Sequence, residues 1–101
     1  MRETAWPLFF IERSEGMRVL LLFDQIQAGY GGKERADTEL GLEKGGIGSF
    51  LMFKDEFTKA GLSALATIYC GPDYFQAHKE EVIHKIHNLI LKTKAEVLFA
   101  G

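Results

Sequence analysis

The sequence predicts an α/β fold with a three-stranded parallel sheet in the order β-α-β-α-β. Two apolar runs, residues 18–23 and 62–70, have the near-continuous hydrophobic character of strands covered on both faces. Two segments with apolar residues at helical spacing, 47–60 and 73–94, alternate with them and lead to a third apolar stretch, 95–101. Right-handed crossovers would then place the first strand in the middle of the sheet.

Length and composition predict a single domain with a packed core. A chain of 101 residues suffices for one such domain, and 47% hydrophobic residues exclude a disordered class. We expect residues 1–16 to form an N-terminal arm and residues 17–101 to form the α/β domain, which resembles half of a Rossmann or flavodoxin-like fold. Because the sheet would stop at its third strand, the arm or a partner chain is expected to cover an open face.

Charge and cysteine content exclude several classes of partner. The net charge is −2 and the basic residues are scattered, so nucleic acid is not an expected partner. The single cysteine indicates a reducing compartment, and we expect the protein to be cytoplasmic. The apolar run 6–11 is too short for a signal segment or a membrane span, so no membrane association is expected.

The expected helices have recognisable faces and ends. In the segment 47–60, one face carries Phe50, Phe53, Phe57 and Ala60, and Gly61 would end the helix. In the segment 73–94, Asp73 would be the N-cap. The buried face of this second helix would hold Phe75, Val82, Ile83, Ile86, Leu89 and Ile90.

A glycine-rich segment, residues 25–46, separates the first strand from the first helix and is expected to be a long loop. It follows a strand, where α/β folds bind phosphates. The dinucleotide pattern begun by Gly29 and Gly31 fails at Glu34, and a Walker pattern around Gly32 fails at both Gln27 and Glu34. A flexible surface loop is the favoured interpretation.

At the start of the expected first helix, Gly46, Gly48 and Ser49 could hold a carboxylate or another small anion with unpaired backbone N–H groups. Capping of the helix by Ser49 is the favoured alternative.

Three histidines raise the question of a metal site. On the second helix only His84 and His87 lie on neighbouring surface, which gives two ligands, with Glu80 nearby. A solvated helix face is the favoured interpretation, and we expect no metal and no cofactor.

Cys70 ends the second strand, just before the Gly71-Pro72 turn, at the edge where α/β proteins bind ligands. A following helix N-terminus could lower its pKa and make it reactive. The chain offers neither a second cysteine nor a local nucleophile signature, so a buried strand-end thiol is favoured, and Cys70 is a weak catalytic candidate. Tyr74 could line a pocket beside it.

Two motifs, AGYGGKERAD at residues 28–37 and CGPDYF at residues 70–75, together resemble the start of the selenoprotein B component of glycine, sarcosine and betaine reductases. That family has a loop of the form GGxGGxxKAD, which is similar to AGYGGKERAD here, and a later strand that runs into CGDNYF, which is similar to CGPDYF. Arg35 replaces the usual lysine, and Pro72-Asp73 departs from the second motif. The resemblance covers residues 17–101. The matching residues are Gly29, Gly31, Gly32, Ala36, Asp37, Cys70, Gly71, Tyr74 and Phe75.

The resemblance implies reductive deamination of small amines, in which a selenocysteine of component B attacks the substrate carbon and a second selenoprotein accepts the fragment. The selenocysteine motif of the family lies beyond residue 101, so no catalytic residue carries over. We expect a partial or truncated component B-like subunit that is not catalytic alone. Its partners would be other reductase subunits or a second copy, and its ligand a small amine or anion, with Asp37 at the binding wall. The alternative is a non-catalytic binding or assembly module that self-associates.

Overall fold

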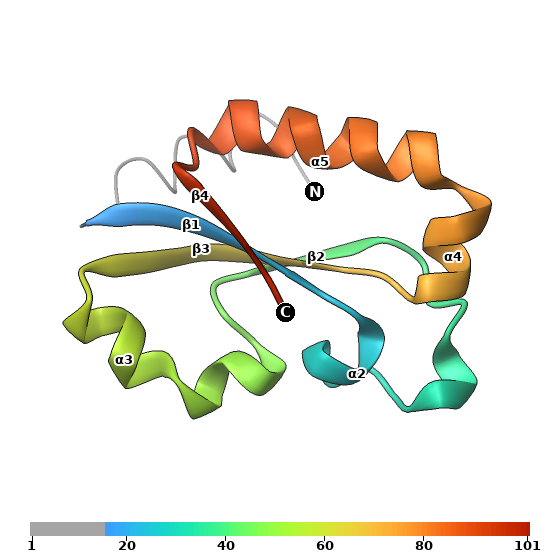
Figure 1. Ribbon diagram of the computed structural model, residues 1–101, viewed down its shortest axis with the longest axis horizontal. Helices are drawn as coiled ribbons and strands as arrows, with labels where there is room; N and C mark the ends of the chain where they lie inside the picture. The colour runs from blue at the N-terminus through green and yellow to red at the C-terminus, as the bar shows by residue number, and fades with distance from the viewer. Residues whose placement is uncertain (1–15) are drawn as a thin grey trace.

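The computed structural model describes residues 16–101, in which a four-stranded mixed sheet lies between two layers of helices (Figure 1). The strand order is β2-β3-β1-β4. Strand β1 (Met17–Phe23) runs parallel to β3 (Leu62–Tyr69) on one side and to β4 (Val97–Ala100) on the other. Strand β2 (Gly41–Lys44) pairs antiparallel with β3.

The α/β class is confirmed, with the first strand between the two other parallel strands. The expectation of a three-stranded, purely parallel, Rossmann-like sheet is wrong, because part of the expected loop forms β2. This strand is four residues long and contains Gly41, over which the ring of Tyr69 packs, so a side chain at position 41 would collide with that ring. Pairing with the edge of β3 creates a strand that the local sequence hardly favours.

The remainder of the expected loop is also ordered into short elements. Helix α2 (Gln25–Ala28) starts with a capping box, in which the Asp24 carboxylate accepts the N–H of Gln27 and the Gln27 side chain accepts the N–H of Asp24. Gly29 ends the helix in the left-handed conformation, with φ 88°. A 3-10 turn, η1 (Lys33–Arg35), follows.

The first expected helix, residues 47–60, is two elements. A 3-10 helix, η2 (Gly48–Met52), leads into α3 (Lys54–Lys59), and Phe53 interrupts the helix at φ −129°. Phe50 and Phe57 are buried and Phe53 packs against them, as the spacing predicts, but Ala60 is exposed. Gly61 follows at φ 74° and ends the segment.

The second expected helix, residues 73–94, is likewise divided. Helix α4 (Pro72–Ala77) begins with Gly71 as N-cap, so the expectation that Asp73 is the N-cap is wrong. Helix α5 (Lys79–Thr93) follows after a break at His78, whose ring stacks on Tyr74 at 4.3 Å between centroids. The predicted apolar face is buried or partly buried, except that Ile83 is 52% exposed.

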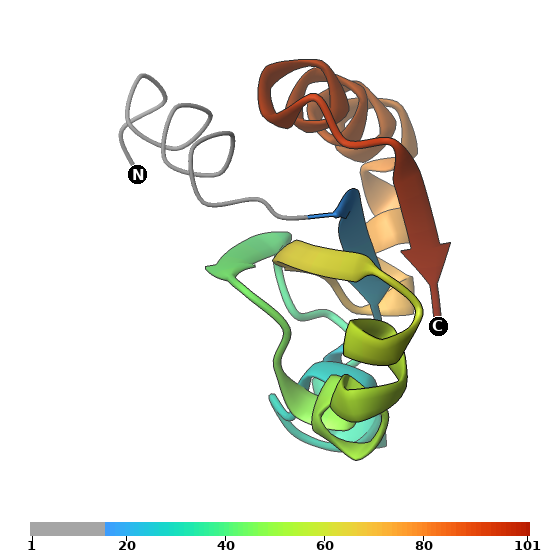
Figure 2. The same ribbon diagram turned by 90° about the vertical axis from the view of Figure 1, so that its left-hand side faces the viewer.

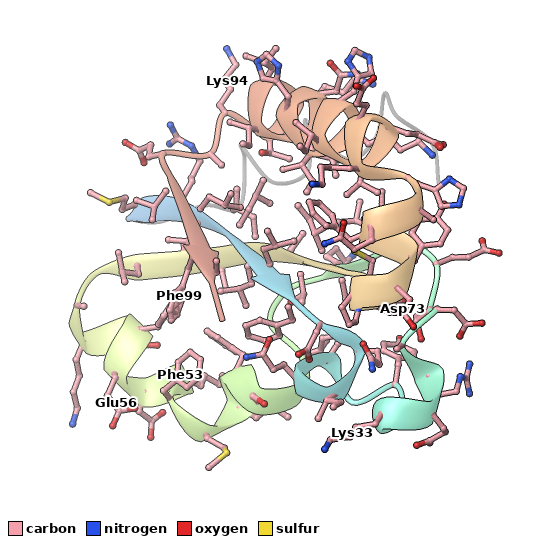
Figure 3. The ribbon with its side chains drawn as sticks, turned by 45° about the vertical axis from the view of Figure 1, so that its right-hand side comes forward. Lys33, Phe53, Glu56, Asp73, Lys94 and Phe99 are labelled. Atoms are coloured by element: carbon pink, nitrogen blue, oxygen red, sulfur yellow. The ribbon has the colours of Figure 1, made fainter. Side chains whose placement is uncertain are left out.

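The sheet separates two cores. Helices α4 and α5 cover one face, and α2, η2 and α3 cover the other (Figures 1 and 2). On the second face, Phe53 and Phe99 meet edge to face at 5.8 Å between ring centroids, which joins α3 to β4 (Figure 3). The fully enclosed side chains of the two cores include Val19, Leu20, Leu21, Ile68 and Val82.

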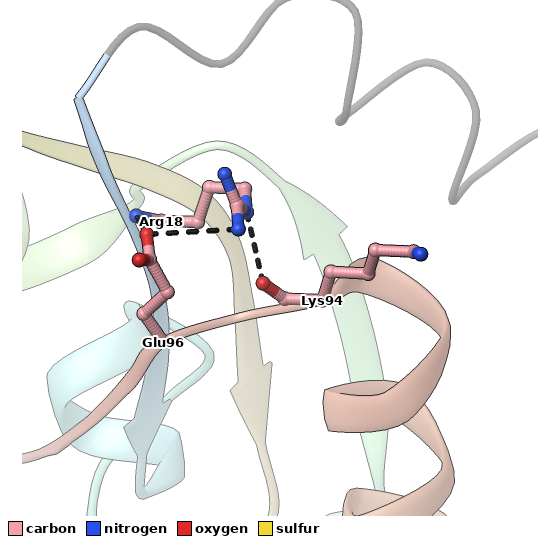
Figure 4. Close-up of polar contacts among 3 residues, drawn as sticks. All are labelled: Arg18, Lys94 and Glu96. Carbon is pink, nitrogen blue, oxygen red and sulfur yellow. Dashed lines mark hydrogen bonds and ion pairs between the residues drawn. The ribbon is translucent and has the colours of Figure 1, made fainter.

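Arg18 joins the end of α5 to the first strand (Figure 4). Its Nε donates to the carbonyl of Lys94 at 2.8 Å, and its guanidinium lies 3.7 Å from the Glu96 carboxylate. Lys94 adopts the left-handed conformation at φ 56°, which turns the chain from α5 toward β4. The end of α5 is therefore fixed beside the start of β1.

Candidate functional site

A crevice opens at the carboxyl ends of the parallel strands, on the same edge as Cys70. The connection from β1 to β3 crosses the sheet face that α3 covers, and the connection from β3 to β4 crosses the face that α5 covers. The two connections therefore diverge beside β1. α/β folds bind ligands at such a point. The cavity there has a volume of about 300 Å³. Its lining comprises Leu22, Phe23, Asp24, Gln27, Cys70, Gly71, Pro72, Phe75, Val82, Ile86, Ala100 and Gly101.

The crevice is mostly apolar, with a polar corner at the start of α2. The capping box of Asp24 and Gln27 fixes that corner, because each of the two residues binds the backbone of the other. Across the opening, the N–H of Gly101 donates to the carbonyl of Leu22 at 3.0 Å and holds the end of β4 against β1. The arrangement suits a small ligand that has an apolar part and one polar end.

Cys70 lies in the wall of this crevice, but its thiol is nearly enclosed. Its backbone N–H donates to the carbonyl of Phe23 at 3.3 Å, and the residue is 8% exposed. Burial raises the pKa of the Cys70 thiol, whereas the sequence suggested that a helix N-terminus could lower it. The thiol is therefore protonated at neutral pH, which disfavours nucleophilic chemistry.

The raised pKa of Cys70 predicts a pH-dependent contribution to stability. The unfolded chain loses the thiol proton near its ordinary pKa of about 8.5, whereas the native state retains it to higher pH. The stabilisation is therefore complete below that pKa and falls as the pH rises above it. We expect the difference in free energy of unfolding between the wild type and Cys70→Ala to shrink between about pH 7 and pH 10. A constant difference in urea denaturation over this range would contradict the burial effect.

The N-terminus of α4, just beyond Cys70, is occupied by the chain itself. The N–H groups of Asp73 and Tyr74 donate to the carbonyl of Ala36 at 2.9 and 3.4 Å, and the N–H of Gly71 donates to the carbonyl of Thr38 at 2.9 Å. Figure 3 shows Asp73 at the start of α4, beside the segment that follows η1. A backbone carbonyl thus takes the position that an anion would take at a helix start.

A second hollow, of about 550 Å³, adjoins this contact between the segment 36–38 and α4. Tyr30 stacks on Tyr69 with ring centroids 4.5 Å apart, and its hydroxyl donates to the Glu43 carboxylate at 2.6 Å. That hydrogen bond raises the pKa of Tyr30, so the phenol stays protonated. Arg35 and Asp37 also line the hollow, which makes it more polar than the crevice.

The remaining predicted site residues lie apart from the crevice. Gly29 ends α2, and the carbonyl of Gly32 accepts the side-chain amide of Gln25, which is 2% exposed. Gly31, at φ 121°, is closely approached by the Arg35 side chain. These three glycines shape the loop around η1.

The segment from Gly46 to Ser49 also has a structural role. Gly48, at φ 60°, packs against the backbone of α2, and Gly46 lies against the Phe50 ring. The expectation that Ser49 caps the helix is wrong, because the N-cap of η2 is Ile47 and no side chain caps it. Tyr74 packs against the core beneath α5, not into the crevice.

Within residues 16–101, no group of three or more His, Cys, Asp or Glu side chains lies close enough to hold a metal ion. His84 contacts Asn88, with 3.3 Å between its Nε2 and the amide nitrogen. In the same part of the chain, no helix is long and apolar enough to span a bilayer.

The family model of glycine/sarcosine/betaine reductase selenoprotein B matches residues 16–101. The chain belongs to the glycine/sarcosine/betaine reductase selenoprotein B family. No curated protein and no solved structure matches the chain.

The two motifs that resemble the selenoprotein B family meet in space. Ala36 and Asp37 end the glycine-loop motif, and Gly71 and Tyr74 belong to the second motif. The hydrogen bonds to the carbonyls of Ala36 and Thr38 join them. In this selenoprotein B relative, the two motifs are therefore one structural unit at the carboxyl edge of the sheet.

Several residues of this edge were missed by sequence reasoning. The Asp24 and Gln27 capping box has a readable signature, an acidic residue followed three positions later by Gln at a helix start. Tyr30 and Glu43 lie on either side of η1 and come together only through β2, so no local signal could pair them.

Proposed function

We propose that this chain acts as a component B-like subunit in the reductive deamination of small amines, and that it contributes a wall of the ligand-facing or subunit-facing crevice without the catalytic group. The family match supports a component B-like protein. The crevice lies where the connections between the parallel strands diverge, and this position supports it as the binding site. The single cysteine also supports our inference of a cytoplasmic location.

The observation that carries the non-catalytic part of the proposal is the state of Cys70. Its thiol is nearly enclosed, its pKa is raised by burial, and the sequence contains no second cysteine. Reduction of an amine substrate needs a group that exchanges electrons, and a protonated, enclosed thiol is a poor one. The proposal therefore assigns that group to a part of the reductase that residues 16–101 do not include.

The proposal is tested by adding glycine, sarcosine or betaine to the isotope-labelled chain and following its amide signals by NMR. We expect shifts concentrated at the crevice, at Gly71, Ala100 and Gly101, and no amine release by the chain alone. Ala100→Leu narrows the opening and should weaken the shifts, whereas Val97→Leu on the same strand should not. Shifts confined to the hollow at Tyr30 would place the ligand elsewhere, and amine release by the chain alone would contradict the non-catalytic role.

A self-associating assembly module is the second candidate, and the open edge of β4 favours it. This strand ends the sheet order, and it exposes 37% of Val97 and 41% of Leu98, with Met17 44% exposed on the neighbouring strand. Apolar edge strands promote pairing. Sedimentation should then give a dimer that Leu98→Lys dissociates, whereas a stable monomer at all concentrations would remove this candidate.

A further inference from the structure

The polar corner of the crevice carries its charge. Among the described residues that line the crevice, Asp24 alone is charged, and Gln27 beside it has the one side-chain amide. The other lining residues offer apolar side chains, the Cys70 thiol or glycine backbone. A charged ligand in this crevice must therefore be matched at the corner. Because charges interact strongly next to apolar walls, the Asp24 carboxylate attracts a cation there and repels an anion.

The capping box engages one atom of each side chain and leaves a second one open. Asp24 Oδ1 accepts the N–H of Gln27 at 2.8 Å, and Gln27 Oε1 accepts the N–H of Asp24 at 3.1 Å. Since that N–H needs an acceptor, the Gln27 amide turns its oxygen toward it and its Nε2 away. Within residues 16–101, Asp24 Oδ2 and Gln27 Nε2 have no hydrogen-bond partner, and neither atom is buried.

The Gln27 amide is held in place by the end of β4. A Cβ added at Gly101 would lie 2.7 Å from Gln27 Nε2 and 3.0 Å from its Oε1, so the amide rests directly on the Gly101 backbone. The N–H of Gly101 is in turn fixed to the carbonyl of Leu22. The corner therefore presents one acceptor with negative charge and one donor in positions that are set before a ligand binds.

We propose that this pair of atoms selects a small ammonium compound that retains at least one N–H. Asp24 Oδ2 accepts a charge-assisted hydrogen bond from the ligand nitrogen, and Gln27 Nε2 donates to an acceptor of the same ligand, such as a carboxylate oxygen. The inference rests on the proposed function, because it takes the crevice as the ligand site. It adds the two specificity-determining residues and assigns the amine, and not a simple anion, to the crevice.

Two substitutions exchange the open atoms and retain the capping box. Asp24→Asn keeps an oxygen for the N–H of Gln27 but replaces Oδ2 with an NH₂ group. Gln27→Glu keeps an oxygen for the N–H of Asp24 but replaces Nε2 with a carboxylate oxygen. All four residue types are ordinary at these capping positions, so both variants should fold, which urea denaturation checks. Asp55→Asn, in the first turn of α3, is the matched control away from the crevice.

The test is an NMR titration of the isotope-labelled chain with glycine, betaine, methylammonium chloride and sodium acetate. Glycine and methylammonium should move the Gly101 amide signal, and glycine should also move the side-chain NH₂ signals of Gln27. Acetate should move neither. Betaine, whose nitrogen is fully methylated, should bind about tenfold more weakly than glycine, since it cannot donate the charge-assisted hydrogen bond.

The variants separate the two contacts. Asp24→Asn should weaken the binding of both glycine and methylammonium by about tenfold or more. Gln27→Glu should weaken glycine but not methylammonium, which has no carboxylate for position 27 to bind. Asp55→Asn should leave every affinity unchanged.

Three results would overturn the inference while leaving the crevice as the ligand site. They are glycine binding that Asp24→Asn does not weaken, acetate binding as tight as that of methylammonium, and equal affinity for betaine and glycine. If none of the four compounds moved a signal of the crevice, the proposed function itself would be contradicted, and this inference with it.

Discussion

Replacing Gly71 with alanine is expected to lower the free energy of unfolding by about 3 kcal/mol, as severe overpacking does. The backbone of Gly71 has φ −75°, which alanine adopts easily. The added Cβ, however, would collide with the carbonyl of Ala36, which is held there by the N–H groups of Asp73 and Tyr74. Urea denaturation measures the loss, and the NMR signals of residues 36–38 should move with it.

Gly29→Ala is the matched control for this prediction. Gly29 lies at φ 88°, but a Cβ there would meet nothing within 4 Å. The cost should therefore be limited to backbone strain, about 1 kcal/mol. If both variants lost the same stability, the steric role of Gly71 would be wrong.

Thr67→Val is expected to lower the free energy of unfolding by about 2 kcal/mol, because it leaves buried polar groups without their partner. Thr67 is fully buried in β3, and its hydroxyl donates to the carbonyl of Gly45 at 2.8 Å. The same hydroxyl accepts the N–H of Ile47 at 3.3 Å. Valine preserves the shape but removes both hydrogen bonds, so the segment between β2 and η2 should exchange its amide hydrogens faster.

Thr93→Val provides the comparison within the same protein. Thr93 is also buried, at 2% exposure, but its hydroxyl donates only to the carbonyl of Leu89, one turn earlier in its own helix. That contact is local, so valine should cost less than about 1 kcal/mol. An equal loss from the two variants would show that burial of the methyl groups, and not the bridging hydroxyl, determines the effect of Thr67.

The parallel strands were predictable because each is an uninterrupted apolar run with a clear end. β1 follows Gly16, and β3 lies between Gly61 and the Gly71-Pro72 turn. The helix breaks at Phe53 and His78 were not predictable, because neither position carries Gly or Pro. Tertiary contacts, such as the stacking of His78 on Tyr74, accompany the breaks instead.

Of the predicted site residues only Cys70 lines the crevice, and the direction of its pKa shift was not predictable from the sequence. The end of an apolar strand placed Cys70 in the wall of the crevice. The pKa of the Cys70 thiol is raised because the fold packs around it. The sequence suggested a vacant helix start beyond it, but the start of α4 is occupied. The Ala36 carbonyl, from a segment with no helical or strand period, fills that position. Only the assembled fold brings these parts together.

The direction of β2 limits how a sheet of this kind can grow. Strand β2 pairs antiparallel with the outer edge of β3, so a further right-handed βα unit cannot add a parallel strand next to β3. Any relative that enlarges the array with parallel strands must add them beside β4, next to the crevice. Enlargement of the sheet would then deepen the crevice wall at Ala100 and Gly101, while the opposite edge of the sheet, at β2, would keep its shape.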